Sequence, residues 1–136
     1  MPINPIDFLN SAKQLINGNT EIDLRNATSR AYYAAYHEAK RISKYSNFKA
    51  SNNKAGIHQR MIEKLIKHQG SSSKDADIRQ IGILLSQCKK GRTKADYSIH
   101  SGYSKIEADT IVLQVAKFNS NINQTSLNKL LTLVIY

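Results

Sequence analysis

Apolar residues recur along this chain at intervals of three and four positions, which is the spacing of a helix with one buried face. Proline occurs only at positions 2 and 5, so it interrupts no helix beyond residue 5. Clusters of glycine, serine and asparagine separate the periodic stretches, and no stretch shows the alternation of a strand. The pattern predicts five helices, over residues 6–16, 21–45, 56–68, 74–99 and 105–122.

Polar residues mark where several of these helices begin. Thr20 precedes the second predicted helix and Ser73 the fourth, and both hydroxyls are able to accept a hydrogen bond from the first turn. Ser104 and Glu107 have the spacing of a capping box before the fifth helix. These residues are therefore expected to fix the helix starts.

A chain of 136 residues with five such helices is expected to form one all-α domain over residues 1–136. Short connections between amphipathic helices favour an antiparallel bundle of four to five helices. Residues 125–136 are strongly apolar, so we expect this C-terminal tail to be covered by the domain itself or by a second subunit.

The sequence predicts a cytoplasmic protein with no membrane partner. Cys88 is the only cysteine, which excludes an internal disulfide and is typical of a reducing compartment. The N-terminal residues lack a basic start followed by a long apolar run, so no signal peptide is expected. The apolar tail is too short to cross a bilayer.

The net charge favours polyanionic partners. Twenty lysines and arginines against ten acidic residues give a formal charge of +10, a field that attracts RNA or DNA. Many small proteins are basic without such a partner, so charge alone leaves both interpretations open. A membrane surface is less favoured, because no segment combines a strongly apolar face with a dense basic rim.

The second predicted helix contains the segment RNATSRAYYAAYHEAK, residues 25–40. At 100° per residue its alanines gather on one side, where they would let another helix approach closely. Arg30, Tyr33 and His37 fall together on the opposite side. This stripe is either an ordinary solvated face or the lining of a cleft, in which the aromatic ring would serve a subunit interface or base stacking.

In the fourth predicted helix an arginine lies on the apolar side. Arg92 falls within a stripe of aliphatic residues, and Asp96, four positions later, is a ready ion-pair partner. The pair is either structural or a cation held in place for an interface or active site. His100 would point near Asp96 if the helix continued that far. His58 could contribute to the cleft, but it is more simply interpreted as a surface histidine at the start of the third helix.

The segments RNATSRAYYAAYHEAK, GIHQRMIEKLIKHQG and KKGRTKADY together resemble the HEPN superfamily of small bacterial and archaeal helical proteins, over about residues 5–122. The likeness is closer to the branch with an Arg-x-x-Ala-Asp-Tyr motif, here Arg92, Ala95, Asp96 and Tyr97. The resemblance implies a bundle that dimerises. In active members an arginine and a histidine from each subunit meet at the dimer interface and cleave RNA without a metal ion.

The resemblance further implies a toxin or an anti-phage defence effector. Many members pair with a small nucleotidyltransferase antitoxin. In this chain the gap between Arg92 and His100 is longer than in active members, whereas Arg30 and His37 have a matching gap on a different helix. A non-catalytic helical module that binds a nucleotidyltransferase is therefore the alternative function.

The leading prediction is a metal-independent endoribonuclease that acts as a homodimer. Histidine suits proton transfer near neutral pH, and the planar arginine suits the phosphate. No residues have zinc-ligand spacing and no nucleotide-binding fingerprint is present, so no metal or cofactor is expected. The candidate catalytic residues are Arg92, Asp96, His100, Arg30 and His37, and the candidate RNA-binding residues are Tyr33, Tyr97, Lys89, Lys90 and Lys94.

Overall fold

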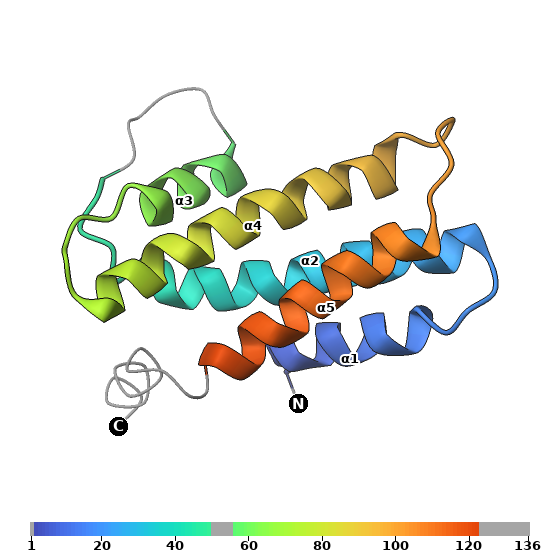
Figure 1. Cartoon of the computed structure of the whole chain (residues 1–136), viewed down its shortest axis with the longest axis horizontal. Coiled ribbons are helices and arrows are strands. Elements are labelled where there is room, and N and C mark those ends of the chain that lie inside the picture. Colours follow the sequence, from blue (N-terminus) through green and yellow to red (C-terminus); the bar gives the residue numbers. More distant parts are fainter. Residues whose placement is uncertain (1, 50–55, 123–136) are drawn as a thin grey trace.

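A computed structural model describes residues 2–49 and 56–122, and every regular element in those residues is a helix. This confirms the all-α bundle (Figure 1). The five helices are α1 (Pro5–Leu15), α2 (Glu21–Ser43), α3 (Ile57–Ile66), α4 (Ser73–Tyr97) and α5 (Lys105–Ile122). The expected C-terminal tail, residues 125–136, lies outside the described residues.

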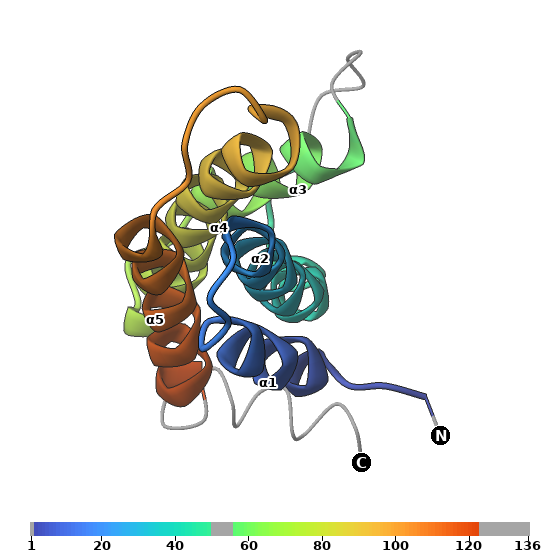
Figure 2. The same cartoon turned by 90° about the vertical axis from the view of Figure 1, so that its right-hand side faces the viewer.

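Helix α2 lies at the centre of the bundle, where it contacts α1, α4 and α5 (Figure 2). Five alanines of α2 are buried, and their small side chains allow these neighbours to pack closely against its backbone. The aliphatic stripe of α4 is also buried, from Ile78 to Cys88. The buried faces of both helices are therefore the ones that the sequence pattern predicts.

Helix α3 is short and packs mainly along α4, with a smaller contact to α2 (Figure 1). Gly82 of α4 makes the close approach possible, because a Cβ atom there would lie 2.8 Å from the backbone nitrogen of Ile66. The contact fixes α3 beside the middle of α4. This position matters for the site, since α3 contributes His58 and Gln59.

The caps of the helices agree with the sequence in two cases and differ in one. The Thr20 hydroxyl accepts a hydrogen bond from the Asp23 N–H at 3.3 Å, and Ser104 and Glu107 form the predicted capping box. The prediction that Ser73 caps α4 was wrong: Ser72 is the cap, because Asp75 is the residue that reciprocates its hydrogen bond.

A buried histidine joins the end of α3 to the start of α4. His68 is only 4% exposed, and its Nε2 lies 2.6 Å from Oδ1 of Asp75. The backbone N–H of Asn47 donates to its Nδ1 at 3.2 Å. The hydrogen bond from His68, with that from Ser72, lowers the pKa of Asp75 to about 2.

Arg25 of α2 holds the loop that follows α4. Its guanidinium is 5% exposed and donates to the carbonyl oxygens of Ala95 at 2.9 Å and Ser98 at 3.2 Å, and also to that of Ser101. Its Nε pairs with Glu21 at 3.1 Å. These bonds satisfy carbonyl groups that the end of a helix leaves without partners.

Helix α4 ends at Tyr97, two residues before the predicted end. Ile99, the last residue of the predicted helix, is 67% exposed in the loop beyond it. The Arg25 contacts explain the difference, because they bind the carbonyl groups at which the helix would otherwise continue. Among the described residues, no helix is long and apolar enough to cross a membrane.

Candidate functional site

Arg92 of α4 is paired with the carboxylate one turn later. Its Nε lies 2.9 Å from Oδ2 of Asp96, so the ion pair expected from the sequence is confirmed. The Ser29 hydroxyl of α2 donates to the same carboxylate oxygen at 3.3 Å. The arginine side chain is 20% exposed, so it is a partly buried charge.

Three tyrosine rings surround the guanidinium of Arg92. Its central carbon lies 5.6 to 5.7 Å from the ring centroids of Tyr32, Tyr33 and Tyr97, within the range of a cation–π interaction. Its Nη2 also donates to the Tyr33 hydroxyl at 3.2 Å. Four predicted site residues, Arg92, Asp96, Tyr33 and Tyr97, therefore lie together.

His58 joins this cluster from α3. Its Nδ1 lies 2.5 Å from the hydroxyl of Tyr32, and its ring stacks on Tyr36 at a centroid distance of 4.1 Å. The interpretation of His58 as a simple surface histidine was wrong, because the ring is half-buried between α3 and α2. The buried ring of Tyr32 lies between His58 and Arg92, contacting both.

The surroundings favour the uncharged form of His58. Burial lowers the pKa of this imidazole below its usual value of 6.5, and the positive charges of Arg92 and Lys89 lower it further. The imidazole is therefore neutral at neutral pH. Where Nδ1 donates to the Tyr32 oxygen, the lone pair of Nε2 is left to accept a proton from another molecule.

The other predicted catalytic residues are not bonded to Arg92. Arg30 is exposed on α2. His37 stacks on Phe8 of α1 at 5.2 Å and lies at the edge of the cluster, with its ring 5.2 Å from that of Tyr36 and 6.5 Å from that of Tyr33. His100 is exposed in the loop after α4, because the helix ends before reaching it. Within the described residues, no hydrogen bond or ion pair joins Arg30, His37 or His100 to Arg92.

The predicted RNA-binding lysines have different surroundings. Lys94 forms an ion pair with Glu107 of α5, so its charge is already balanced. Lys89 donates to the side-chain carbonyl of Gln59 at 3.2 Å. Lys89 and Lys90 line an open groove of about 310 Å³ between α3 and α4, together with Gln59, Ser86 and Thr93.

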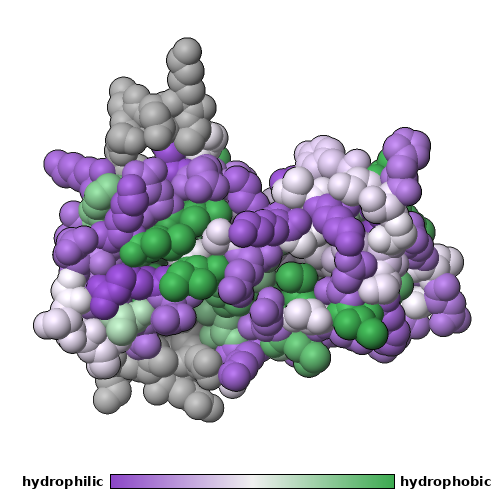
Figure 3. Space-filling view, turned by 45° about the horizontal axis from the view of Figure 1, so that its top comes forward, coloured by the Kyte–Doolittle hydropathy of each residue, from purple (hydrophilic) through white to green (hydrophobic). Residues whose placement is uncertain are grey.

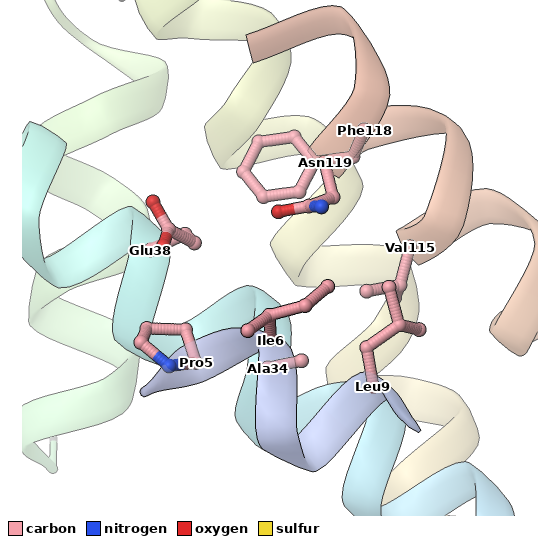
Figure 4. A pocket seen from close by; sticks show the side chains of 8 residues that line it. All are labelled: Pro5, Ile6, Leu9, Ala34, Glu38, Val115, Phe118 and Asn119. Carbon is pink, nitrogen blue, oxygen red and sulfur yellow. The ribbon is translucent and has the colours of Figure 1, made fainter. Parts of the chain in front are cut away.

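A second cavity, among the described residues, is mostly apolar and closed. Figure 4 shows side chains of α1, α2 and α5 converging on it, with Glu38 at its edge. Glu38 is paired with Arg41 at 3.2 Å, and the lining leaves no space for even one water molecule. This cavity is a packing feature of the core. Within residues 2–49 and 56–122, no three histidine, cysteine or acidic side chains are grouped so as to hold a metal ion.

Two members of the cluster escaped the sequence analysis, Tyr32 and His58. A signal for Tyr32 was present, because it lies at helical spacing from the buried Thr28 and Ala39. No signal within one helix brings His58 to Tyr32, since that contact depends on how α3 packs. No family model, curated protein or solved structure matches this chain.

Proposed function

We propose that this chain is a metal-independent endoribonuclease that acts as a homodimer, with Arg92 and His58 as its catalytic residues. The observation that carries the proposal is their arrangement on the two sides of Tyr32. One is a partly buried permanent cation and the other an imidazole whose surroundings favour its neutral form. These are the two kinds of group that cleavage of RNA without a metal ion requires.

The reaction assigns a role to each group. The ribose 2′-hydroxyl attacks the adjacent phosphorus, a bond forms between them, and the bond to the 5′-oxygen breaks. The products are a 2′,3′-cyclic phosphate and a free 5′-hydroxyl. His58 accepts the proton of the 2′-hydroxyl, and Arg92 stabilises the charge that develops on the phosphate oxygens.

A second proton must reach the departing 5′-oxygen, so the reaction needs two proton-transfer groups. Each subunit supplies one His58, and a dimer with two-fold symmetry would supply both: one in its neutral form to accept the 2′-hydroxyl proton, the other in its protonated form to donate a proton to the 5′-oxygen. The role of Asp96 and Tyr33 is to hold Arg92, since each contacts the guanidinium directly. Both act on the substrate through Arg92.

The biological setting follows from the resemblance to the HEPN superfamily. On that basis the chain is a cytoplasmic toxin or anti-phage effector, and a small nucleotidyltransferase is its candidate antitoxin. The formal charge of +10 agrees with an RNA substrate and with an acidic inhibitor.

A non-catalytic binding module is the second candidate function, and one observation favours it. The charge of Arg92 is balanced by Asp96. His100, the histidine that follows Arg92 in the HEPN-like pattern, is exposed in a separate loop. An arginine that only fixed a surface for a nucleotidyltransferase would need no histidine beside it.

Cleavage of a mixed RNA substrate in EDTA tests the proposal. We expect wild-type activity to survive chelation and to fall about 100-fold or more in His58→Asn and in Arg92→Gln. Lys40→Gln, which changes an exposed residue of α2, serves as the matched control. Loss of activity in His37→Asn or His100→Asn, with His58→Asn unaffected, would assign proton transfer to those residues instead. Absence of cleavage by folded wild-type protein would favour the binding module.

A further inference from the structure

The groove between α3 and α4 has a regular chemical pattern along one helix face. Ser86, Lys89, Lys90 and Thr93 of α4 are spaced so that they lie on the same side. Gln59 of α3 forms the opposite wall, and its contact with Lys89 joins the two walls. In Figure 3, where this side of the molecule comes forward, hydrophilic side chains predominate and apolar ones form small groups.

Two of the basic residues of α4, Lys89 and Lys90, line this groove. Residues 78–95 contain five basic residues and no acidic residue. Three of the five are engaged elsewhere: Arg79 donates to backbone carbonyl groups, Arg92 pairs with Asp96, and Lys94 pairs with Glu107. Of the described residues, Lys89 and Lys90 are the basic residues of this stretch that pair with no carboxylate and no carbonyl group of the backbone.

The uncharged lining residues suit the same type of ligand. The hydroxyl groups of Ser86 and Thr93 and the amide group of Gln59 are able to donate hydrogen bonds to phosphate oxygens or to exchange them with ribose hydroxyls. No acidic side chain lines the groove, so nothing in it repels an anion.

An aromatic side chain lies at one end of the groove. Tyr97 follows Thr93 by one helical turn and is 69% exposed. From Ser86 to Tyr97 the helix extends about 16 Å, enough for a short single strand. An exposed ring beside a basic track is the arrangement by which proteins bind single-stranded nucleic acid, since bases stack on the ring while cations contact the backbone.

We propose that the α3–α4 groove binds the sugar–phosphate backbone of single-stranded RNA, with Tyr97 stacked on a base. The inference rests on the proposed function in taking RNA as the substrate, and it adds the path along which that substrate lies. The path passes Gln59, the residue that follows His58 on α3. An acidic peptide would satisfy the lysines but would have no use for the exposed ring.

Binding of a fluorescein-labelled 2′-O-methyl RNA of about twelve nucleotides, followed by anisotropy, tests the groove separately from catalysis. The methyl group blocks the attacking hydroxyl, so binding is measured without cleavage. We expect the double variant Lys89→Ala/Lys90→Ala to bind about tenfold or more weakly. The slope of log affinity against log salt should fall by about one to two. Lys13→Ala/Lys40→Ala removes the same charge from exposed positions of α1 and α2 and should change affinity much less.

Two further variants test the stacking. Tyr97→Phe keeps the ring and should bind as wild type does, whereas Tyr97→Ala should bind about tenfold more weakly. An equal loss of RNA affinity in the Lys89/Lys90 and Lys13/Lys40 double variants, or no loss in either, would overturn the proposal that this groove binds RNA. A labelled poly-glutamate that binds as tightly as RNA through Lys89 and Lys90 would overturn RNA as its ligand.

The binding measurement with methylated RNA does not depend on whether the protein is a nuclease. Lysine-dependent binding of the methylated RNA by a protein that cleaves no RNA would support the groove and refute the proposed reaction. Cleavage with binding that does not depend on Lys89 and Lys90 would support the reaction and refute the groove.

Discussion

At the scale of single residues, the environment of His58 is set by its neighbours on other helices. Tyr36 covers one face of the imidazole, Tyr32 contacts its Nδ1, and Arg92 and Lys89 contribute positive charge. Burial and charge act in the same direction here, because both disfavour a protonated ring. In the proposed reaction the same two basic residues would serve two purposes, attracting the anionic substrate and keeping the nearby imidazole uncharged.

This coupling predicts that Arg92→Gln raises the pKa of His58 towards its usual value of 6.5. Removing a neighbouring positive charge makes protonation of the ring less costly, so the direction of the change is upward. The acid limb of the pH–activity profile should move to higher pH in Lys89→Gln for the same reason. Titration of the imidazole by NMR measures the shift in either variant without requiring activity.

The exposed Lys40 provides a control for the titration. Lys40→Gln makes the same charge change on α2 and should leave the His58 titration where it is in the wild type. An unchanged His58 titration in both Arg92→Gln and Lys89→Gln would contradict the coupling.

At the scale of elements, two arginines five residues apart in α2 have different tasks. Arg25 joins α2 to the end of α4 through buried hydrogen bonds, whereas Arg30 is exposed. Arg25→Met should lower the free energy of unfolding by about 3 kcal/mol, because it leaves the carbonyl groups of Ala95 and Ser101 without the donor that Arg25 supplies. Arg30→Met should change it by about 0.5 kcal/mol or less. Urea unfolding followed by circular dichroism distinguishes the two, and equal effects would refute the assigned role of Arg25.

The elements themselves were predictable because each depends on local pattern. All five helices were expected within a few residues of where they lie, since apolar spacing and capping residues are properties of short segments. The position at which α4 ends was not predictable in this way, because it depends on Arg25, which lies far away in the sequence. One signal was available: Arg25 lies at helical spacing from Thr28 and Tyr32, which are both buried.

The candidate site was predictable only within single helices. The pairing of Arg92 with Asp96 follows from their separation of four residues. The meeting of Tyr32, His58 and Arg92 depends on three helices that pack together, and packing angles are not encoded in periodicity. The groove depends likewise on Gly82, whose missing side chain admits α3, a feature that composition does not single out.

At the scale of the whole molecule, the proposed reaction requires two copies of the chain. One subunit supplies one His58, whereas proton removal and proton donation need two groups. We therefore expect light scattering to give a mass about twice 15.3 kDa at concentrations where RNA is cleaved. Specific activity should fall on dilution, because dissociation by mass action separates the two histidines. Binding of methylated RNA should not fall in parallel, since the groove lies within one subunit. A monomer whose specific activity stays constant on dilution would show that a single chain completes the reaction, and the second proton-transfer group would then have to be found among its own residues.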